Sequence, residues 1–388
     1  MEKIYLDNAA TTPINSEVLA EMMPYLTTNF GNPNSLHEAG RVSKAGIEQA
    51  RNRVALSLGC KPSEVYFTSG ATESNNWFIT QFVKANEKKG KHIITSKIEH
   101  PSVMQVCKQL ENEGYRVTYL DVDQNGLVKI EDLLHEIAGD TILITIMAAN
   151  NEVGAIQNIQ TIANIAKEHN ITFHTDATQA VGALVLDMQK MGIDALSLSA
   201  HKLGGPKGVG ALCVRTGVKF GKFMLGGEQE SGMRAGTSNV AGIVGLGKAI
   251  ELACRDITIN SKKLRTIRDY FIRNVTEKID GVKLNGHPKQ RLPNNANFSF
   301  SRISGESLVC LLDTFGIAVS TGSACSSGSV EPSYVLQAMQ VPLDLVDGAV
   351  RFTFSISNTK QELDFVVLKL IECVSKLRKI SPKTKRGR

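Results

Sequence analysis

The sequence predicts an α/β fold with one large, mainly parallel sheet and a second, smaller α+β domain. Short apolar runs such as "EVYFTSG", "TILITIMAAN" and "DALSLSA" alternate with longer segments between residues 63 and 214. A connecting segment such as "IQTIANIAKEHN" repeats its apolar residues at helical spacing. Strands that alternate with helices form parallel βαβ units whose helices cover the sheet. The length of 388 residues exceeds what one small core needs.

The second domain is predicted from a change of pattern after the long helical region 240–279. Shorter strand-like runs follow, "NNANFSFS" and "AVRFTFS" among them, and the segment "KQELDFVVLKLIECVSKLRKI" has the periodicity of a last helix. We therefore expect a large domain over residues 15–255 and a small α+β domain formed by residues 1–14 and 256–388.

Composition and charge argue against several classes of protein. With 42% hydrophobic and 21% charged residues and no apolar run long enough to cross a bilayer, the chain is not expected in a membrane. The start "MEKIYLDNAATTP" has no apolar signal core, so we expect a cytoplasmic protein. The net charge of +6 is mild and spread along the chain, so direct nucleic-acid binding is not expected, and "SPKTKRGR" reads as a solvated tail.

The cysteines suit a reducing compartment. They number seven, without a C-x-x-C pair, and offer neither a disulfide framework nor the usual zinc or iron–sulfur spacing. Cys213 and Cys310 lie inside apolar runs and are expected to be small buried hydrophobes. Cys325 lies in "STGSACSSGSVEPS", whose small polar residues predict a mobile loop at about residues 320–335. A cysteine on such a loop can attack a substrate at one place and deliver the group it has taken up at another. This requires that the thiol is deprotonated to the thiolate.

Polar residues follow five of the predicted strands, at the edge of the sheet where ligands bind. They are Gly70–Glu73, His100, Asn150–Glu152, Asp176 with Gln179, and Ser199–Lys202. Each group has an ordinary structural reading when taken alone. Because the carboxyl ends of parallel strands meet at one edge, we expect the groups to converge on one site.

Two of these groups suit a phosphorylated, nitrogen-containing ring. The turn in "TSGATESNN" joins a strand to a helix start, where free N–H groups and the Thr72 hydroxyl can bind a phosphate; a glycine turn with a capping residue is the alternative. Asp176 ends a nearly wholly apolar strand, where a carboxylate needs a cationic partner. A pyridinium nitrogen would be such a partner, and a helix N-cap is the alternative.

Lys202 follows an apolar strand and is flanked by glycines. Desolvation at such a strand end lowers the pKa of a lysine and favours the free amine that Schiff-base chemistry needs. The alternative is an ordinary surface lysine. A lysine, an aspartate one βαβ unit upstream and a phosphate-type turn are the parts of a pyridoxal phosphate site. Neither His174 nor His201 has a convincing set of further ligands, so no resident metal is expected.

Two further residues are candidates for the same site. His100, at a strand-to-helix turn, can stack on a flat ring or act as an acid or base; a structural histidine is the alternative. Arg351, inside a strand of the second domain, can clamp a substrate carboxylate, and a structural ion pair is the alternative.

Ordered blocks along nearly the whole chain carry a family resemblance. They include "YLDNAATTP", "FTSGATESNN", "IEHPSV", "HTDATQAVG", "SLSAHKLGGPKGVG", "GMRAGTSN" and "STGSACSSGSVEPSYVLQAM". With these blocks the sequence resembles the cysteine desulfurases of the NifS/IscS type, in the class V aminotransferase group of fold-type I pyridoxal phosphate enzymes. The resemblance implies a seven-stranded large sheet, pyridoxal 5′-phosphate as the cofactor, and a homodimer.

The resemblance also implies roles around the cofactor ring. Lys202 would bind the cofactor covalently, and Asp176 would face the pyridine nitrogen. His100 would stack on the ring and take part in proton transfer, and Gln179 would bond the phenolic oxygen.

The remaining roles concern the phosphate, the substrate and the sulfur. The phosphate would be held by Ala71, Thr72, Ser199, His201 and, from the neighbouring subunit, Thr237. Asn151, which also contacts the cofactor, and Arg351 would hold the substrate carboxylate. Cys325 would accept the sulfur and would meet an iron–sulfur cluster only transiently, on a scaffold partner.

The implied reaction removes sulfur from L-cysteine, giving L-alanine and a persulfide on Cys325. An iron–sulfur scaffold protein or another acceptor would then collect the sulfur. Selenocysteine lyase and cysteine sulfinate desulfinase are the nearest alternatives, since both share the cofactor site. The presence of Cys325 favours persulfide chemistry over them, because selenium or sulfinate elimination can proceed without that thiol. A nucleotide-binding or scaffold protein that kept the sheet is the alternative from another class, because a fold alone does not fix a function.

Overall fold

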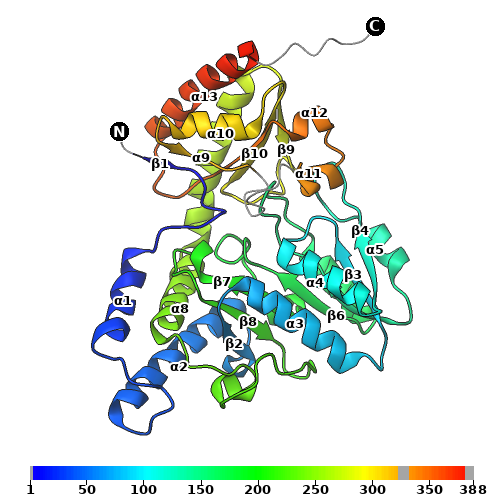
Figure 1. The fold of residues 1–388 in the computed structure, drawn as a ribbon, viewed down its shortest axis with the longest axis vertical. Coiled ribbons are helices and arrows are strands. Elements are labelled where there is room, and N and C mark those ends of the chain that lie inside the picture. Colours follow the sequence, from blue (N-terminus) through cyan, green and yellow to red (C-terminus); the bar gives the residue numbers. More distant parts are fainter. Residues whose placement is uncertain (1–2, 322–331, 381–388) are drawn as a thin grey trace.

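The computed structural model describes residues 3–321 and 332–380, and its larger part is built on a seven-stranded sheet (Figure 1). The strand order is β2-β8-β7-β6-β5-β3-β4, and all neighbours are parallel except those of β8. The strands are β2 (Val65–Thr68), β3 (His92–Ser96), β4 (Arg116–Leu120), β5 (Thr141–Thr145), β6 (Thr172–Asp176), β7 (Ala195–Ser199) and β8 (Gly210–Val214). The predicted α/β class with a large, mainly parallel sheet is confirmed.

Strand β8 runs antiparallel to both β7 and β2, although the sequence pattern predicted parallel units. A parallel return needs a crossover of a dozen or more residues, usually a helix. Only residues 200–209 connect β7 to β8, so the chain turns back instead. This short connection begins with the 3₁₀ turn η2 (Ala200–Lys202), which places Lys202 at the carboxyl end of β7.

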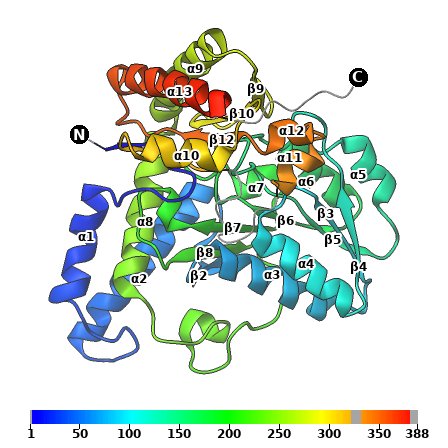
Figure 2. The ribbon, with the colours of Figure 1, turned by 45° about the horizontal axis from the view of Figure 1, so that its top comes forward.

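Helices cover both faces of the large sheet. The helices of this part are α1 (Ser16–Thr27), α2 (Glu38–Leu58), α3 (Ala71–Asn86), α4 (Pro101–Asn112), α5 (Ile130–Glu136), α6 (Ile159–Glu168), α7 (Met188–Met191) and α8 (Val240–Arg255), with 3₁₀ turns η1 (Pro62–Glu64) and η3 (Gln229–Gly232). Figure 2 shows α3 and α4 along one face. Successive strand residues serve opposite faces: Ile93 packs with α3 and α4, and Ile94 packs with α2, α6 and α8. The inner strands β3 and β5 are buried along their whole length, whereas the edge strand β4 is mostly not, so apolar runs are expected chiefly inside the sheet.

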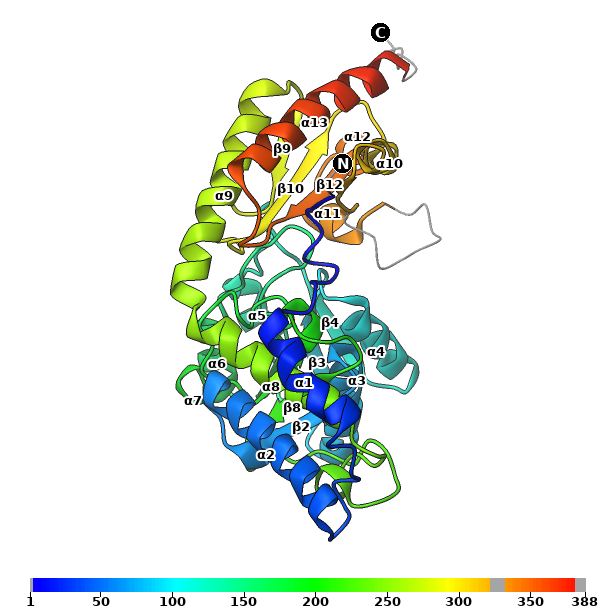
Figure 3. The ribbon, with the colours of Figure 1, turned by 90° about the vertical axis from the view of Figure 1, so that its left-hand side faces the viewer.

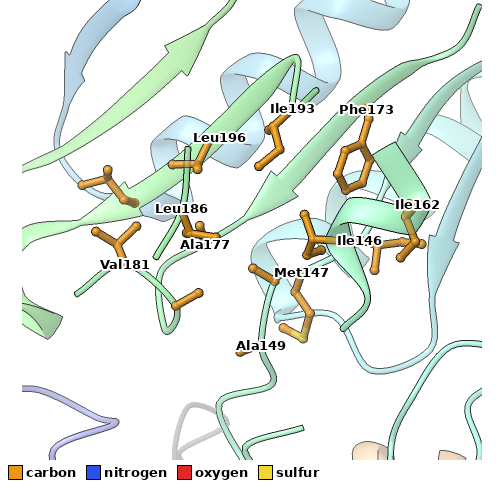
Figure 4. Close-up of a cluster of buried hydrophobic side chains, with 14 of the residues drawn as sticks. Ile146, Met147, Ala149, Ile162, Phe173, Ala177, Val181, Leu186, Ile193 and Leu196 are labelled. Atoms are coloured by element: carbon orange, nitrogen blue, oxygen red, sulfur yellow. The ribbon is translucent and has the colours of Figure 1, made fainter. Parts of the chain in front are cut away.

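The core on the α6 side is close to the edge of the sheet where the strands end. Figure 4 shows Ile162 of α6 against Phe173 of β6, with Leu196 of β7 and the Met147 side chain in the same cluster. All four side chains are nearly or fully buried. Packing of this kind fixes the strand ends from which the polar side chains project.

The smaller part is built on an antiparallel sheet of order β12-β10-β9 (Figure 3). Its elements are β1 (Ile4–Tyr5), α9 (Ile257–Lys278), β9 (Val282–Asn285), β10 (Asn295–Phe300), α10 (Gly305–Asp313), β11 (Ile317–Ala318), α11 (Tyr334–Ala338), α12 (Leu343–Val346), β12 (Ala349–Thr353) and α13 (Lys360–Ile380). An aromatic cluster fills its core, with ring centroids of Phe271 and Phe352 5.0 Å apart. The predicted α+β character of this part agrees with these elements.

The chain passes from the hydrophobic core of the large sheet to that of the small sheet between α8 and α9. Leu246 and Ile250 of α8 pack in the core of the large sheet, whereas Phe271 and Val275 of α9 pack in that of the small sheet. Strand β1 pairs with β11, so the chain begins in the small domain. The domain bounds of 15–255 against 1–14 with 256–388 stay a prediction, because Leu336 of α11 and Val346 of α12 pack in the core of the large sheet.

The N-terminal segment links the two domains across the strand ends. The Leu6 N–H donates to the Ala318 carbonyl at 2.8 Å, and the Thr12 N–H donates to the His201 carbonyl at 2.9 Å. The segment between these bonds therefore passes beside the connection that carries Lys202.

Two sequence expectations about burial have opposite outcomes. Cys213 on β8 is fully buried, as predicted, but Cys310 is exposed, so the prediction for Cys310 is wrong. Cys310 lies on amphipathic helix α10, whose buried face is formed by Leu308 and Leu312, and Cys310 is on the opposite face. In residues 3–321 and 332–380, no helix is long and apolar enough to span a membrane.

Candidate functional site

A cavity of about 470 Å³ lies at the carboxyl ends of the large sheet's strands. The N-terminal segment contributes Ala9, Ala10 and Thr11, and the small domain contributes Arg351. The predicted site residues that line this cavity are Ala71, Thr72, His100, Asn151, Asp176, Gln179, Ser199, His201, Lys202 and Arg351. The five polar groups that follow strands thus meet at one place.

The start of α3 forms an anion cradle. Among the described residues no side chain caps this helix, so its first N–H groups are left for a ligand in the cavity. Gly70 precedes the helix with φ 155°, a conformation that L side chains rarely adopt. A Cβ at Gly70 would lie 3.7 Å from Ser199 Oγ and would narrow the cradle.

Lys202 is held at the end of β7 by the N-terminal segment. Its Nζ donates to the carbonyl oxygens of Ala9 and Ala10, each at 2.6 Å. Gln179 Nε2 donates to the same Ala9 carbonyl at 3.0 Å. The amine and the amide therefore lie side by side on the cavity wall.

Asp176 lies at the end of β6 and is 5% exposed. Its Oδ1 accepts the Thr178 N–H at 3.0 Å, and its Oδ2 accepts from Asn75 Nδ2 at 2.7 Å. A carboxylate held in this way can still pair with a cationic ring nitrogen in the cavity.

The two histidines of the cavity are held neutral. Burial lowers the pKa of His100, Asp176 opposes this shift, and Lys202 adds to it. Burial also lowers the pKa of His201 to about 4, and the charges of Lys202 and Lys207 act in the same direction. A neutral His201 beside the anion cradle offers an N–H donor rather than a charge.

Arg351 is 3% exposed, and its guanidinium is oriented from two sides. One terminal nitrogen, Nη2, donates to Asp7 Oδ1 at 2.9 Å, and Nη1 donates to the Asn151 carbonyl at 3.0 Å. Within the described residues, Nε has no hydrogen-bond partner. Nε is shielded from the cavity, but Nη1 and Nη2 each carry a second N–H, and Arg351 lines the cavity, so terminal donors are left for a substrate carboxylate.

Sequence reasoning missed three features of the cavity. Asp7 was not expected to pair with Arg351. The carbonyl oxygens of Ala9 and Ala10 were not expected to accept hydrogen bonds from Lys202 Nζ. The third feature is Glu73, whose carboxylate accepts from Arg234 Nε at 2.8 Å in the first turn of α3. This ion pair neutralises a charge that would otherwise repel a phosphate. The sequence signal for it was Glu73 itself, an acid inside a phosphate-type turn.

Glu99 immediately precedes His100 and is fully buried. Its carboxyl group accepts from Ser96 Oγ at 2.6 Å and from the Met147 N–H at 2.9 and 3.1 Å. Burial raises the pKa of Glu99 to about 8, although both hydrogen bonds oppose this shift. At a pH between 4.5 and about 8, Glu99 is therefore protonated in the folded protein and ionised in the unfolded chain.

Glu99→Gln is expected to change how stability depends on pH. The pKa of Glu99 is 4.5 in the unfolded chain and about 8 in the folded protein. Between these values the wild type loses stability as pH rises, by up to roughly 1.4 kcal/mol per pH unit. The Glu99→Gln variant does not lose stability in this way. The free energy of unfolding of the variant should therefore rise relative to that of the wild type from about pH 5 to about pH 8. Chemical denaturation across that range measures it, with Glu306→Gln at an exposed site of α10 as the control. Parallel pH profiles of wild type and Glu99→Gln would contradict the expectation.

Among the predicted site residues that the structure describes, Thr237 alone does not line this cavity. Thr237 is exposed, and it is absent from the wall of its own chain's cavity. Cys325 and most of the predicted loop at 320–335 lie outside the described residues. Their proposed roles therefore rest on the resemblance.

The described residues hold no group of three or more His, Cys, Asp or Glu side chains that could bind a metal ion. His174 is fully buried, and its ring nitrogens pair with Thr145 Oγ1 at 2.8 Å and Ser197 Oγ at 3.0 Å. Burial lowers the pKa of His174 to about 4. His174 is thus a neutral residue of the sheet core.

The cavity residues fit pyridoxal 5′-phosphate. The glycine cradle at an uncapped helix start suits the phosphate, the Asp176 carboxylate suits the ring nitrogen, and the Lys202 amine suits the aldehyde. All of these groups lie on the wall of one cavity, which is what a single bound cofactor requires.

Comparisons with known proteins agree with this fit. The family model described as "Aminotransferase class-V" matches residues 4–366. The cysteine desulfurase IscS of Dictyoglomus turgidum is 51% identical over 380 residues, covering 98% of this chain and 96% of the relative. The cysteine desulfurase IscS of Methanosarcina thermophila is 52% identical over 381 residues, covering 98% and 94%.

Solved structures agree as well. One described as a "NifS-like protein" superimposes with a TM-score of 0.92 at 39% identity and covers 97% of this chain and all of its own. The resemblance to the NifS/IscS group and the predicted fold are therefore confirmed. This chain belongs to the class V aminotransferase family.

Proposed function

We propose that this protein is a pyridoxal phosphate-dependent cysteine desulfurase, which converts L-cysteine to L-alanine and carries the sulfur as a persulfide on Cys325. The observation that carries the proposal is one cavity that gathers a lysine amine, a strand-end carboxylate and an anion cradle, in a chain about half identical to desulfurases over nearly its full length. The alternative of a scaffold protein without a cofactor gives no reason for that combination.

The cofactor, when bound, supplies an electron sink that makes the substrate Cα proton acidic and polarises the bonds at Cβ. On the chain's side, Lys202 anchors the cofactor and its Nζ moves the proton at Cα. Asp176 holds the ring nitrogen in its protonated form. Ala71, Thr72, Ser199 and His201 bind the phosphate, and Gln179 bonds the phenolic oxygen.

Substrate orientation is assigned to Arg351 and Asn151. The Arg351 guanidinium pairs with the substrate carboxylate, while Asp7 and the Asn151 carbonyl keep it in place. The substrate sulfur is then presented to the Cys325 thiolate, which forms a new S–S bond as the substrate's Cβ–S bond breaks. The electron pair of the broken bond stays on the substrate carbon, which takes up a proton and leaves as alanine.

The partners follow from the same proposal. The sulfur acceptor is an iron–sulfur scaffold protein or another protein thiol. The second subunit of a homodimer supplies Thr237 to the phosphate. Exposed apolar side chains near the N-terminus support such a partner, with Phe30 80% and Leu36 91% exposed. The six described cysteines are free thiols, which supports the cytoplasm as the compartment.

The test is product stoichiometry. Purified protein given L-cysteine and a thiol reductant should release sulfide and alanine in equal amounts. Parallel reactions with L-selenocysteine and L-cysteine sulfinate separate the two nearest alternatives. Turnover of either alternative substrate without measurable turnover of L-cysteine would replace the desulfurase assignment, as would sulfide accompanied by pyruvate instead of alanine.

A further inference from the structure

A buried chain of hydrogen bonds connects Asp176 to His100. Asn75 Nδ2 donates to Asp176 Oδ2 at 2.7 Å and to Ser102 Oγ at 2.9 Å. Ser102 Oγ lies 2.8 Å from His100 Nδ1. Asn75 is fully buried, and Asp176 and Ser102 are 5% and 7% exposed, so most of the chain is shielded from water.

The direction of the first link is fixed by chemistry. A carboxylate oxygen only accepts, so the amide group of Asn75 must turn its NH₂ toward Asp176. That NH₂ has two N–H bonds, and the second one points to Ser102. Within the described residues, the amide oxygen Oδ1 is buried without a partner. Asn75 thus keeps both donors engaged while its acceptor is left unsatisfied, which an ordinary structural asparagine avoids.

The direction of the second link follows from the first. Ser102 Oγ accepts from Asn75, so its one proton is left to donate to His100 Nδ1. The Ser102 backbone N–H also donates to His100 Nδ1, at 3.2 Å. Two donors aimed at Nδ1 require that nitrogen to be unprotonated, so the neutral ring carries its proton on Nε2.

We propose that Asn75 and Ser102 are positioning residues that lock His100 in its neutral Nε2–H tautomer. This inference deepens the proposed function and rests on it for its meaning in the reaction. The ring then offers the cavity a hydrogen-bond donor and has no free lone pair. His100 is therefore not the base that removes the Cα proton, and that task is left to Lys202. The low pKa of His100, caused first by burial, agrees with a neutral ring.

The tautomer can be measured directly by ¹⁵N NMR of histidine-labelled, cofactor-loaded protein. The chain has eight histidines, and His100→Gln identifies the signals of His100. In the wild type we expect an unprotonated Nδ1 and a protonated Nε2. A protonated Nδ1 in the wild type would overturn the proposal.

Asn75→Asp is the decisive variant. It keeps the shape of the side chain and replaces the N–H donor that faces Ser102 with a carboxyl oxygen. At 2.7 Å from the Asp176 carboxylate, the new carboxyl oxygen needs a shared proton in that contact, so toward Ser102 it can only accept. Ser102 Oγ can then only accept from His100, so a signal from Nδ1–H should appear. Asn76→Asp, the same change at the next position of α3, is the matched control, and there His100 should be unchanged, since Asn76 Nδ2 bonds the Thr72 carbonyl instead.

Ser102→Ala provides a second variant in case Asn75→Asp does not fold. It removes the hydroxyl donor, so the ¹⁵N shift of Nδ1 should move toward that of a free lone pair. If His100 is unchanged in whichever of the two variants folds, the proposal is overturned. The readout needs no turnover, so failure of the desulfurase assay and failure of this inference are distinguishable.

Discussion

Lys202→Ala is expected to abolish the release of sulfide and alanine from L-cysteine and to remove the visible absorption of the covalently bound cofactor. The side chain has two tasks on the proposed assignment, since it anchors the cofactor and moves the Cα proton. Loss of a positioned proton-transfer group alone costs about 10²- to 10⁴-fold in rate. Loss of the anchor adds to this, so activity should fall below detection.

The structure explains why no neighbouring amine can substitute. Lys202 Nζ is held by two carbonyl oxygens at 2.6 Å at the end of β7. Among the described residues, the other lysine on the cavity wall is Lys207, which is exposed on the β7–β8 connection. Lys207→Ala is therefore the matched control, and its visible absorption should persist. Persistence of the covalent absorption in Lys202→Ala would show that another amine binds the cofactor.

Much of this site could be predicted because strand ends are readable in a sequence. His100, Asp176 and Lys202 each follow a run of buried strand residues, and parallel strands bring such positions together. The same logic failed at β8, because the orientation of a strand depends on the length of the connection before it. It also failed at Cys310, because the apolar run around it is one face of a helix and the cysteine is on the other.

Pairing between distant segments could not be predicted in the same way. Asp7 and Arg351 are 344 positions apart, and nothing in their local sequence indicates that the segment after β1 runs beside β12 and brings them together. Asn75 had a local signal, since it lies in the phosphate-type turn segment "TSGATESNN". Its contacts with Asp176 and Ser102 are nevertheless made across 101 and 27 positions, and only the folded sheet edge shows them.

Cys325→Ser is expected to abolish sulfide release from L-cysteine while leaving turnover of L-cysteine sulfinate or L-selenocysteine, where the wild type has it. A sulfinate or selenide group can leave its carbon without help from an enzyme thiol, whereas sulfur transfer from L-cysteine needs a nucleophile that takes the sulfur. Serine has nearly the same size, but its hydroxyl is a far weaker nucleophile at neutral pH. A fall specific to L-cysteine would therefore assign sulfur transfer to Cys325.

The described residues on either side of segment 322–331, which contains Cys325, are held beside the cavity. The Ser320 carbonyl accepts the Arg351 N–H at 2.7 Å, and Cys325 follows Ser320 by five positions in the sequence. On the other side, Ser333 Oγ donates to Glu152 Oε2 at 2.6 Å, and the Tyr334 hydroxyl donates to the Glu99 carbonyl at 2.6 Å. These two anchors contact Glu152 and Glu99, the sequence neighbours of Asn151 and His100 in the proposed site.

Cys310→Ser is the matched control for this prediction. Cys310 is the exposed thiol of α10, and it lies on the face of the small domain's helix that is turned away from the core. Sulfide release should be unchanged there, because exposure alone does not make a sulfur acceptor. If Cys325→Ser retained full activity on L-cysteine while Cys310→Ser lost it, the persulfide would belong to Cys310. If both variants kept full activity, the reaction would proceed by elimination, and the protein would be a lyase.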